Sequence, residues 1–181
     1  MLLPPCPEPM RTPPTPLVGE LTVVRQATAF DVDLLVRWHA DPAVAEFWDG
    51  ETFTREEMLA RLARLDVDAY VIEAAGQPVG YLQVWFGDDP DDCGIDMFLT
   101  PNARGRGLGP DSARTLARYL LREAGRTRVS VDPYLWNDRA VRAWKKAGFR
   151  PVEEREPDDE HLHAWVLMTF DPAHEPASTA I

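Results

Sequence analysis

Glycines and arginines alternate in the stretch from Pro101 to Gly109, whose sequence is PNARGRGLG. An apolar run, Ile95–Leu99, precedes it and predicts a strand, and leucines and alanines at helical spacing follow it. The sequence therefore predicts a tight turn that leads into a helix at or just after Gly109, with Pro110 at the first helical position. The free backbone N–H groups and the positive dipole end of such a helix form an anion site, most often for phosphate.

Two common phosphate motifs do not fit this turn. A P-loop needs Gly-Lys-Ser or Gly-Lys-Thr, but Pro110 follows Gly109 here. The dinucleotide fingerprint needs a third glycine three residues after its second, and that position after Gly107 is again Pro110. The pattern that remains is Arg104-x-x-Gly107-x-Gly109.

Carboxylates form the second group of candidate residues. Asp96 interrupts the apolar strand before the glycine-rich turn, where a carboxylate is costly unless it has a partner or a task. Asp132 precedes Pro133 at the end of another short predicted strand. The chain has 30 acidic and 19 basic residues, a net charge of −11, which argues against a nucleic-acid partner. The same charge suits a cationic small molecule if acids line a cleft, although on charge alone solubility is the better explanation.

The elements expected to position these residues follow a β-α-α-β-β-β-α-β-α-β-β order, a mixed α/β chain. Residues 1–18 are rich in proline and predict a disordered or extended tail; residues 19–171 predict a single domain, and residues 172–181 a second tail. No apolar run approaches the roughly 20 residues that span a bilayer, so no membrane partner is expected. With only two cysteines and no targeting segment, a cytoplasmic protein without a metal site is expected. Strands are predicted at 21–25, 69–74, 79–86, 93–99, 128–132, 151–156 and 161–170, and helices at 30–40, 55–66, 110–124 and 137–147.

The glycine-rich pattern resembles the pyrophosphate loop of the GCN5-related N-acetyltransferases (GNATs), which hold acyl-coenzyme A. A second signature, Asn137-x-x-Ala140-x-x-x-Trp144-x-Lys146-x-Gly148-Phe149, is similar to the helix of that family that packs beside the pantetheine arm. The resemblance covers residues 20–170. It implies an α/β (α+β) fold with a central mixed, mostly antiparallel sheet of about seven strands flanked by about four helices, splayed between the fourth and fifth strands.

The resemblance also implies a chemistry, in which an amine attacks the thioester of acetyl-CoA directly, without a covalent enzyme intermediate. Backbone N–H groups at the splayed strand bind the pantetheine and polarise the thioester carbonyl. Acetyl-CoA is the implied co-substrate. The implied coenzyme-binding residues are Met97, Phe98, Leu99, Arg104, Gly105, Arg106, Gly107, Leu108, Gly109, Asn137 and Trp144.

Three further patches resemble the aminoglycoside 6′-N-acetyltransferases: Trp38, Val44 and Trp48 with their spacing, Gly94-Ile95-Asp96, and Asp132-Pro133. The implied acceptor is a polycation, and Asp96 is the implied group that takes its proton. One of the aspartates within 88–92 is a weaker candidate for the same surface. The implied substrate-binding residues are Trp48, Asp96, Asp132, Asp158 and Asp159.

One departure concerns the group that protonates the leaving thiolate. Trp144 stands where many family members carry tyrosine, and indole cannot serve as an acid. Tyr134, solvent or the product ammonium remain as alternatives. Among the histidines, His39 is expected on the surface, and His161-x-His163 has no third ligand for a metal.

Other functions remain open at this point. Siderophore-pathway acyltransferases for hydroxylysine-type amines share the Pro42–Trp48 segment, but they tend to have histidine in place of Asp96, which favours an aminoglycoside. A non-catalytic acyl-CoA-binding module is a second alternative, and a protein N-terminus or polyamine acceptor a third. The sequence allows a monomer or a homodimer.

Overall fold

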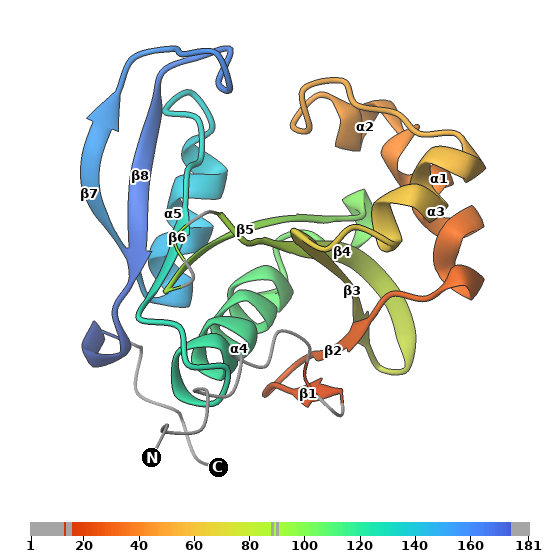
Figure 1. The fold of residues 1–181 in the computed structure, drawn as a ribbon, viewed down its shortest axis with the longest axis horizontal. Helices are drawn as coiled ribbons and strands as arrows, with labels where there is room; N and C mark the ends of the chain where they lie inside the picture. The colour runs from red at the N-terminus through yellow and green to blue at the C-terminus, as the bar shows by residue number, and fades with distance from the viewer. Residues whose placement is uncertain (1–12, 14–15, 88, 90, 175–181) are drawn as a thin grey trace, which may run out of the picture.

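A computed structural model describes residue 13, residues 16–87, residue 89 and residues 91–174. In this part of the chain one sheet holds eight strands in the order β1-β2-β3-β4-β5-β6-β8-β7. Figure 1 shows the five α-helices arranged around this curved sheet. The strands are β1 Leu17–Val18, β2 Val23–Gln26, β3 Val67–Ala74, β4 Gln77–Trp85, β5 Asp92–Leu99, β6 Arg128–Val131, β7 Phe149–Arg155 and β8 Trp165–Phe170. The helices are α1 Val32–His39, α2 Pro42–Ala45, α3 Arg55–Leu62, α4 Leu108–Arg122 and α5 Asp138–Ala147.

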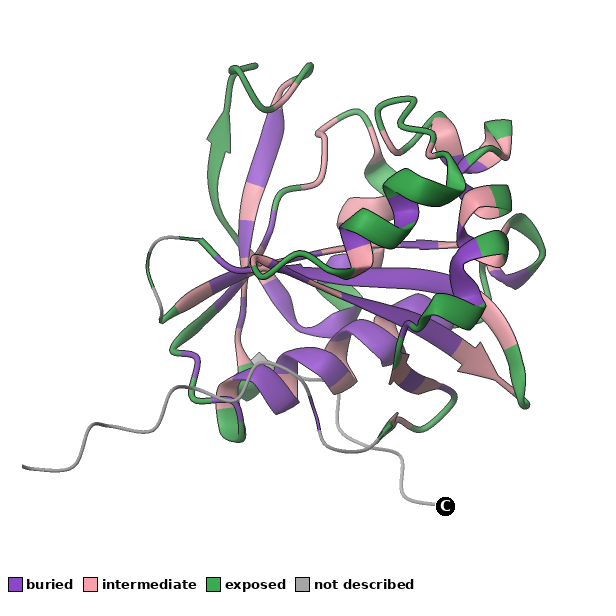
Figure 2. Ribbon diagram, turned by 45° about the vertical axis from the view of Figure 1, so that its right-hand side comes forward, coloured by how far each residue is buried: buried purple, intermediate pink, exposed green. Residues whose placement is uncertain are grey.

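Both faces of the sheet are covered. Side chains alternate along each strand, so neighbouring residues of one strand belong to different cores. Tyr70, Ile72 and Ile95 belong to the core shared with α4, and Val71 and Phe98 belong to a second core with α1, α2 and α3. Figure 2 shows that α4 is buried along the side that meets the sheet. By the same alternation Asp96 shares a face with Phe98, toward α1–α3.

The sheet opens between β5 and β6. These strands pair in parallel only from Asp92↔Arg128 to Gly94↔Ser130, and a hydrogen bond from the Ser130 hydroxyl to the Cys93 carbonyl lies beside this short contact. From Ile95 onward β5 pairs with β4 alone among the described residues. This confirms the predicted splay, with the strand numbers shifted by one because β1 precedes the predicted first strand.

The glycine-rich turn ends where α4 begins. Gly105 and Gly107 have φ of 78° and 81°, which non-glycine residues rarely adopt, and Gly107 is the N-cap. A Cβ added to Gly109 would meet the Met97 side chain at 2.9 Å, so glycine lets the helix start approach β5. The helix begins at Leu108, which places Pro110 at the third helical position rather than the first. A backbone N–H at this position would have no intrahelical partner, so proline loses no hydrogen bond there.

Several expectations about the elements need correction. Leu17–Val18 pairs with β2, so the end of the predicted tail is an edge strand; residues 1–12, 14–15 and 175–181 lie outside the described residues. Helix α3 has the predicted capping box at Thr54 and Glu57 but ends at Leu62, before the predicted Asp66. Strand β8 begins at Trp165 rather than at residue 161, because residues 161–164 are irregular and bend the chain.

His39 was expected on the surface, but it is fully buried. Its ring packs edge-on against Trp48, Phe53 and Phe98 with centroid distances of 5.0–5.7 Å. The periodicity of α1 does not reveal this, because the aromatic partners come from other elements.

Candidate active site

A groove of about 320 Å³ runs along the C-terminal half of β5 and the start of α4. The last three residues of β5, the glycine-rich turn and one side of α5 line it. Of the residues predicted to bind the coenzyme, all but Arg106 lie in its wall. These are Met97, Phe98, Leu99, Arg104, Gly105, Gly107, Leu108, Gly109, Asn137 and Trp144.

The groove is basic, and much of its charge comes from α5. Arg139, Arg142 and Lys146 line it from positions that recur at helical spacing. With the N-terminus of α4 at the other wall, they make the groove suited to a ligand with several phosphates. None of these three residues was predicted to bind the coenzyme, although Lys146 belongs to the Asn137–Phe149 signature and Arg139 and Arg142 lie within the same segment.

The two arginines of the turn differ from expectation. Arg106 is exposed and does not line the groove. Arg104 lines it, but its guanidinium donates to the backbone carbonyls of Leu99 (3.0 Å) and Ala43 (2.7 Å). Arg104 therefore adds positive charge to the groove and also ties the glycine-rich turn to α2.

A second cavity, of about 650 Å³, lies on the α1–α3 side of β5. Trp48, Trp85 and Phe98 give it aromatic walls. Arg61 and His161 also line it, so the cavity combines many acids with few basic groups. Its acidic lining residues are Asp49, Glu51, Asp96, Asp132 and Glu160.

Asp96 lines this cavity and accepts two hydrogen bonds from neighbouring side chains. Gln83 Nε2 donates to Asp96 Oδ2 at 2.9 Å, and Trp85 Nε1 donates to the same oxygen. Gln83 is itself oriented, since its Oε1 accepts from Arg61 and from the Tyr81 hydroxyl. Burial, and then the nearby charge of Asp132, raise the pKa of Asp96 to about 6. A carboxylate with this pKa is a competent proton acceptor near neutral pH.

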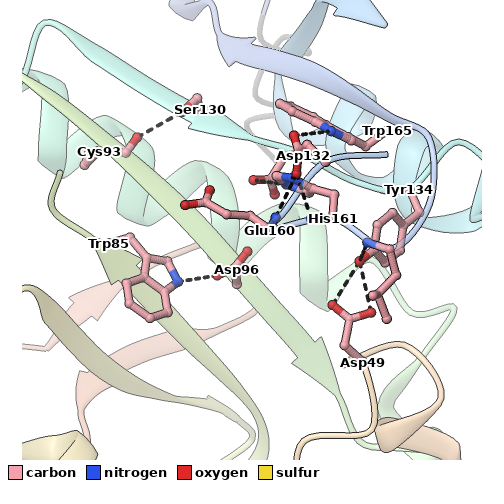
Figure 3. A network of polar contacts seen from close by, with 12 residues as sticks. Asp49, Trp85, Cys93, Asp96, Ser130, Asp132, Tyr134, Glu160, His161 and Trp165 are labelled. Atoms are coloured by element: carbon pink, nitrogen blue, oxygen red, sulfur yellow. Dashed lines mark hydrogen bonds and ion pairs between the residues drawn. The ribbon is translucent and has the colours of Figure 1, made fainter. Parts of the chain in front are cut away.

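Asp132 lies across the cavity from Asp96 and is held by a histidine, as Figure 3 shows. His161 Nε2 is 3.2 Å from Asp132 Oδ2, and His161 Nδ1 is 2.8 Å from Asp158 Oδ1. Asp158 also accepts from Trp165 Nε1. Neither Asp158 nor Asp159 is part of the cavity lining. Asp158 is connected to the cavity by its hydrogen bond with His161, which does line it.

The remaining acidic candidates lie elsewhere. Asp92 pairs with Arg128, and Asp89 accepts from the Asp91 backbone N–H. Neither lines the acidic cavity, and Asp88 lies outside the described residues.

The basic groove and the acidic cavity meet at one place. Met97, Phe98, Ala140 and Trp144 line both, as do Phe47 and Asn137. The Asn137 side chain accepts from the Ala140 N–H and so caps α5. A ligand lying in the groove can therefore present a reactive end to the cavity between the two diverging strands.

The amino-acid sequence also matches a known protein family. A family model described as an acetyltransferase (GNAT) domain matches residues 27–157 of the chain. The chain belongs to the GNAT acetyltransferase family.

Individual relatives of this acetyltransferase are also known. It is 32% identical over 150 residues to a Klebsiella pneumoniae protein named aminoglycoside N(6′)-acetyltransferase type 1, an alignment that covers 72% of this chain and 75% of the relative. A structure of AAC(6′)-Ib with paromomycin and acetyl-CoA has a TM-score of 0.75 at 26% identity, covering 89% of this chain and 99% of that one. A structure of AAC(6′)-Ib with coenzyme A and kanamycin has a TM-score of 0.73 at 27% identity, covering 84% and 96%.

Three of the acidic residues that line the cavity of this acetyltransferase were not predicted from the sequence. Asp49 and Glu51 come from the segment after α2, and Glu160 comes from the turn before β8. Asp49 accepts from the Tyr134 hydroxyl at 2.9 Å, which joins two walls of the cavity. The segments are far apart in sequence, so no local spacing could have brought them together.

Tyr134 was one alternative for protonating the thiolate. Its hydroxyl donates to Asp49 and accepts from the Leu162 N–H, and burial together with the Asp49 hydrogen bond raises its pKa. The acidic proton of Tyr134 is thus already engaged within the cavity wall. In the described part of the chain, no cluster of His, Cys, Asp and Glu is suited to a metal ion, and no helix has the length and apolarity needed to cross a bilayer.

Proposed function

We propose that the chain transfers the acetyl group of acetyl-CoA to a primary amine of a polycationic acceptor, most specifically the 6′-amine of an aminoglycoside. The observation that carries this proposal is the meeting of a basic groove and an acidic cavity at β5, with Asp96 beside the junction. The relatives named above, which act on or bind aminoglycosides, support the choice of acceptor.

The residues divide the work of the reaction. The N-terminus of α4 and the basic side chains of α5 hold the phosphates of acetyl-CoA. The unpaired side of β5 offers backbone groups at Met97–Leu99 to the pantetheine and the thioester carbonyl. Asp132 and the other acids of the cavity hold acceptor ammonium groups, and Trp48 gives an apolar wall for a sugar ring.

Asp96 is the proposed proton acceptor. Both of its hydrogen bonds from described residues reach Oδ2, so Oδ1 keeps its lone pairs for the attacking ammonium or a bridging water. After proton loss the amine nitrogen bonds to the thioester carbonyl carbon, the carbon–sulfur bond breaks, and the coenzyme leaves as a thiolate that takes up a proton.

A thiol-release assay tests the function. Acetyl-CoA is offered with kanamycin, tobramycin, a hydroxylysine or spermidine, and release of free thiol is followed. We expect turnover with the aminoglycosides and a mass increase of one acetyl group on the 6′-amine. Turnover confined to the hydroxylysine or to spermidine would reject the aminoglycoside and keep the acetyltransferase; no turnover with any amine would reject an amine acetyltransferase.

The variant Asp96→Asn tests the proton acceptor. We expect kcat to fall about a hundredfold or more while the acetyl-CoA KM changes little, because the amide cannot accept the proton. In the wild type, kcat falls as the pH drops through about 6, where Asp96 becomes protonated, and the variant loses this limb. The matched control is Asp33→Asn, which removes a surface ion pair with Arg55. Normal turnover by Asp96→Asn would show that Asp96 is structural.

A further inference from the structure

We infer that His161 is a built-in counter-ion of the acceptor site. As an imidazolium it occupies the Asp132 carboxylate in the free enzyme, and an acceptor ammonium must displace it from that carboxylate. The inference rests on the proposed function, because it requires a cationic acceptor at Asp132.

The hydrogen-bond geometry requires the charged ring. Both ring nitrogens of His161 face carboxylate oxygens, at 2.8 Å on Asp158 and 3.2 Å on Asp132. An ionised carboxylate only accepts hydrogen bonds, so both nitrogens must donate, and only the protonated ring has two N–H groups. Burial opposes the charge, but the hydrogen bonds to Asp158 and Asp132 outweigh it and raise the pKa of His161.

The ring is fixed in place and cannot simply turn away. It stacks on Trp165 with a centroid distance of 4.1 Å and an interplanar angle of 17°. Asp158 accepts from the backbone N–H groups of Glu160 and His161, which holds the turn before β8 in register. The groups facing His161 from neighbouring elements are Asp132 after β6, Tyr134 beside it, and Trp165 of β8, whose ring also lies under Arg155.

Asp132 is more accessible to a ligand than His161 is. The Asp132 side chain is 46% exposed and lines the cavity, and the His161 side chain is 14% exposed. An ammonium that reaches Asp132 therefore meets a carboxylate already paired with a cation. Like charges at one carboxylate repel, so ammonium binding at Asp132 favours the neutral ring, which still donates from Nδ1 to Asp158.

This competition has a defined pH dependence. Because the pKa of His161 is raised, the ring is charged at acidic pH and loses its proton as the pH rises through that pKa. Acceptor affinity should therefore rise with pH over the same range. By reciprocal linkage, an acceptor that lowers the pKa of His161 by about 1 pH unit binds the neutral form about tenfold more tightly than the charged form.

Histidine NMR on the full-length protein tests the inference. The His161 signal, assigned by its loss in His161→Gln, is titrated in the free wild type, in Asp132→Asn, and in wild type saturated with kanamycin. We expect a pKa above the ordinary histidine value in the free protein, and a decrease of about 1 pH unit both in Asp132→Asn and with kanamycin. An unchanged pKa in Asp132→Asn would overturn the pairing.

Kinetics provide the second readout. We expect His161→Gln to lower the kanamycin KM severalfold at pH 6 and to have little effect on it at pH 8.5. The matched control is His163→Gln, whose ring is exposed and outside the cavity lining, and it should follow wild type. Turnover with kanamycin and no change in the His161 pKa would overturn this inference alone; failure of every tested amine to bind or react would overturn it together with the proposed function.

Discussion

His39 shows how a single residue supports the acidic cavity without lining it. Its Nδ1 lies 2.8 Å from the Leu35 carbonyl, which can only accept, so the neutral ring carries its proton on that nitrogen. Nε2 is buried, and no described residue bonds to it. The rings of Trp48 and Phe98, both walls of the cavity, pack edge-on against His39. The imidazole thus orients two aromatic walls and must stay uncharged to do so.

The variant His39→Phe should remove a pH dependence of stability. Burial lowers the pKa of His39 from 6.5 to about 4, so the unfolded chain binds a proton that the folded protein refuses between these values. Stability should fall as the pH drops from about 6.5 to about 4, by about 3 kcal/mol in all. Denaturant unfolding of wild type and variant across this range measures the difference.

Asp96 acts in the opposite direction in part of that range. Its raised pKa makes the folded protein bind a proton that the unfolded chain releases, so its contribution to stability grows as the pH falls toward 4. The comparison of His39→Phe with wild type cancels this effect because both contain Asp96. Identical pH profiles for the two proteins would contradict a buried neutral His39.

At the scale of elements, the basic groove depends on α4, and a carboxylate in the first turn of this helix fixes its position. Asp111 accepts from the backbone N–H groups of Glu20, Leu21 and Thr22 and from the Thr22 hydroxyl, at 2.7–3.1 Å. The segment between β1 and β2 is thereby tied to the start of the helix. The glycine-rich turn before α4 is held from the other side by Arg104.

The variant Asp111→Asn should be strongly destabilised. An amide has one acceptor oxygen, so its NH2 group would face at least one backbone N–H donor and the charge-assisted hydrogen bonds would be lost. We expect a loss of about 1–3 kcal/mol in the free energy of unfolding. Chemical denaturation measures it. Asp138→Asn, an exposed first-turn aspartate on α5, is the matched control and should cost about 1 kcal/mol or less. Equal stabilities of the two variants would show that the contacts of Asp111 contribute nothing special.

Local signals explain which elements could be predicted. The capping box at Thr54, the glycines at 105 and 107 and the Asn137 signature each act within a few residues, and the structure has the predicted element at all three places. The resemblance to the GNAT family then predicted the splay of the sheet. Tertiary contacts account for the rest: β1 exists because Val18 pairs with Val23, and Asp49 joins the cavity because Tyr134 holds it. Such pairings depend on distant parts of the chain and leave no local pattern.

The whole molecule carries its net charge of −11 unevenly. The basic groove gathers Arg104, Arg139, Arg142 and Lys146, while the adjoining cavity gathers most of the acids of the site. The two regions share a wall at Met97 and Phe98. An overall acidic protein thus offers a local positive field to an anionic donor.

Neutralising this field should weaken donor binding selectively. We expect the double variant Arg142→Gln, Lys146→Gln to raise the acetyl-CoA KM by about tenfold, and to leave the acceptor KM nearly unchanged. Added salt should raise the wild-type acetyl-CoA KM and affect the variant less. Steady-state kinetics with either substrate varied provide the test. Arg122→Gln, exposed at the end of α4, is the control; an equal change in both substrates' KM would contradict separate fields.

The shared wall of Met97 and Phe98 also bears on how two substrates coexist at one catalytic centre. A polyanion that strays into the cavity meets carboxylates, and a polycation that strays into the groove meets guanidinium groups. Each compartment therefore rejects the other's ligand, and non-productive dead-end complexes are disfavoured for both. We therefore expect little inhibition by an excess of either substrate, because the opposite charges of the groove and the cavity lie on either side of the shared wall at Met97 and Phe98.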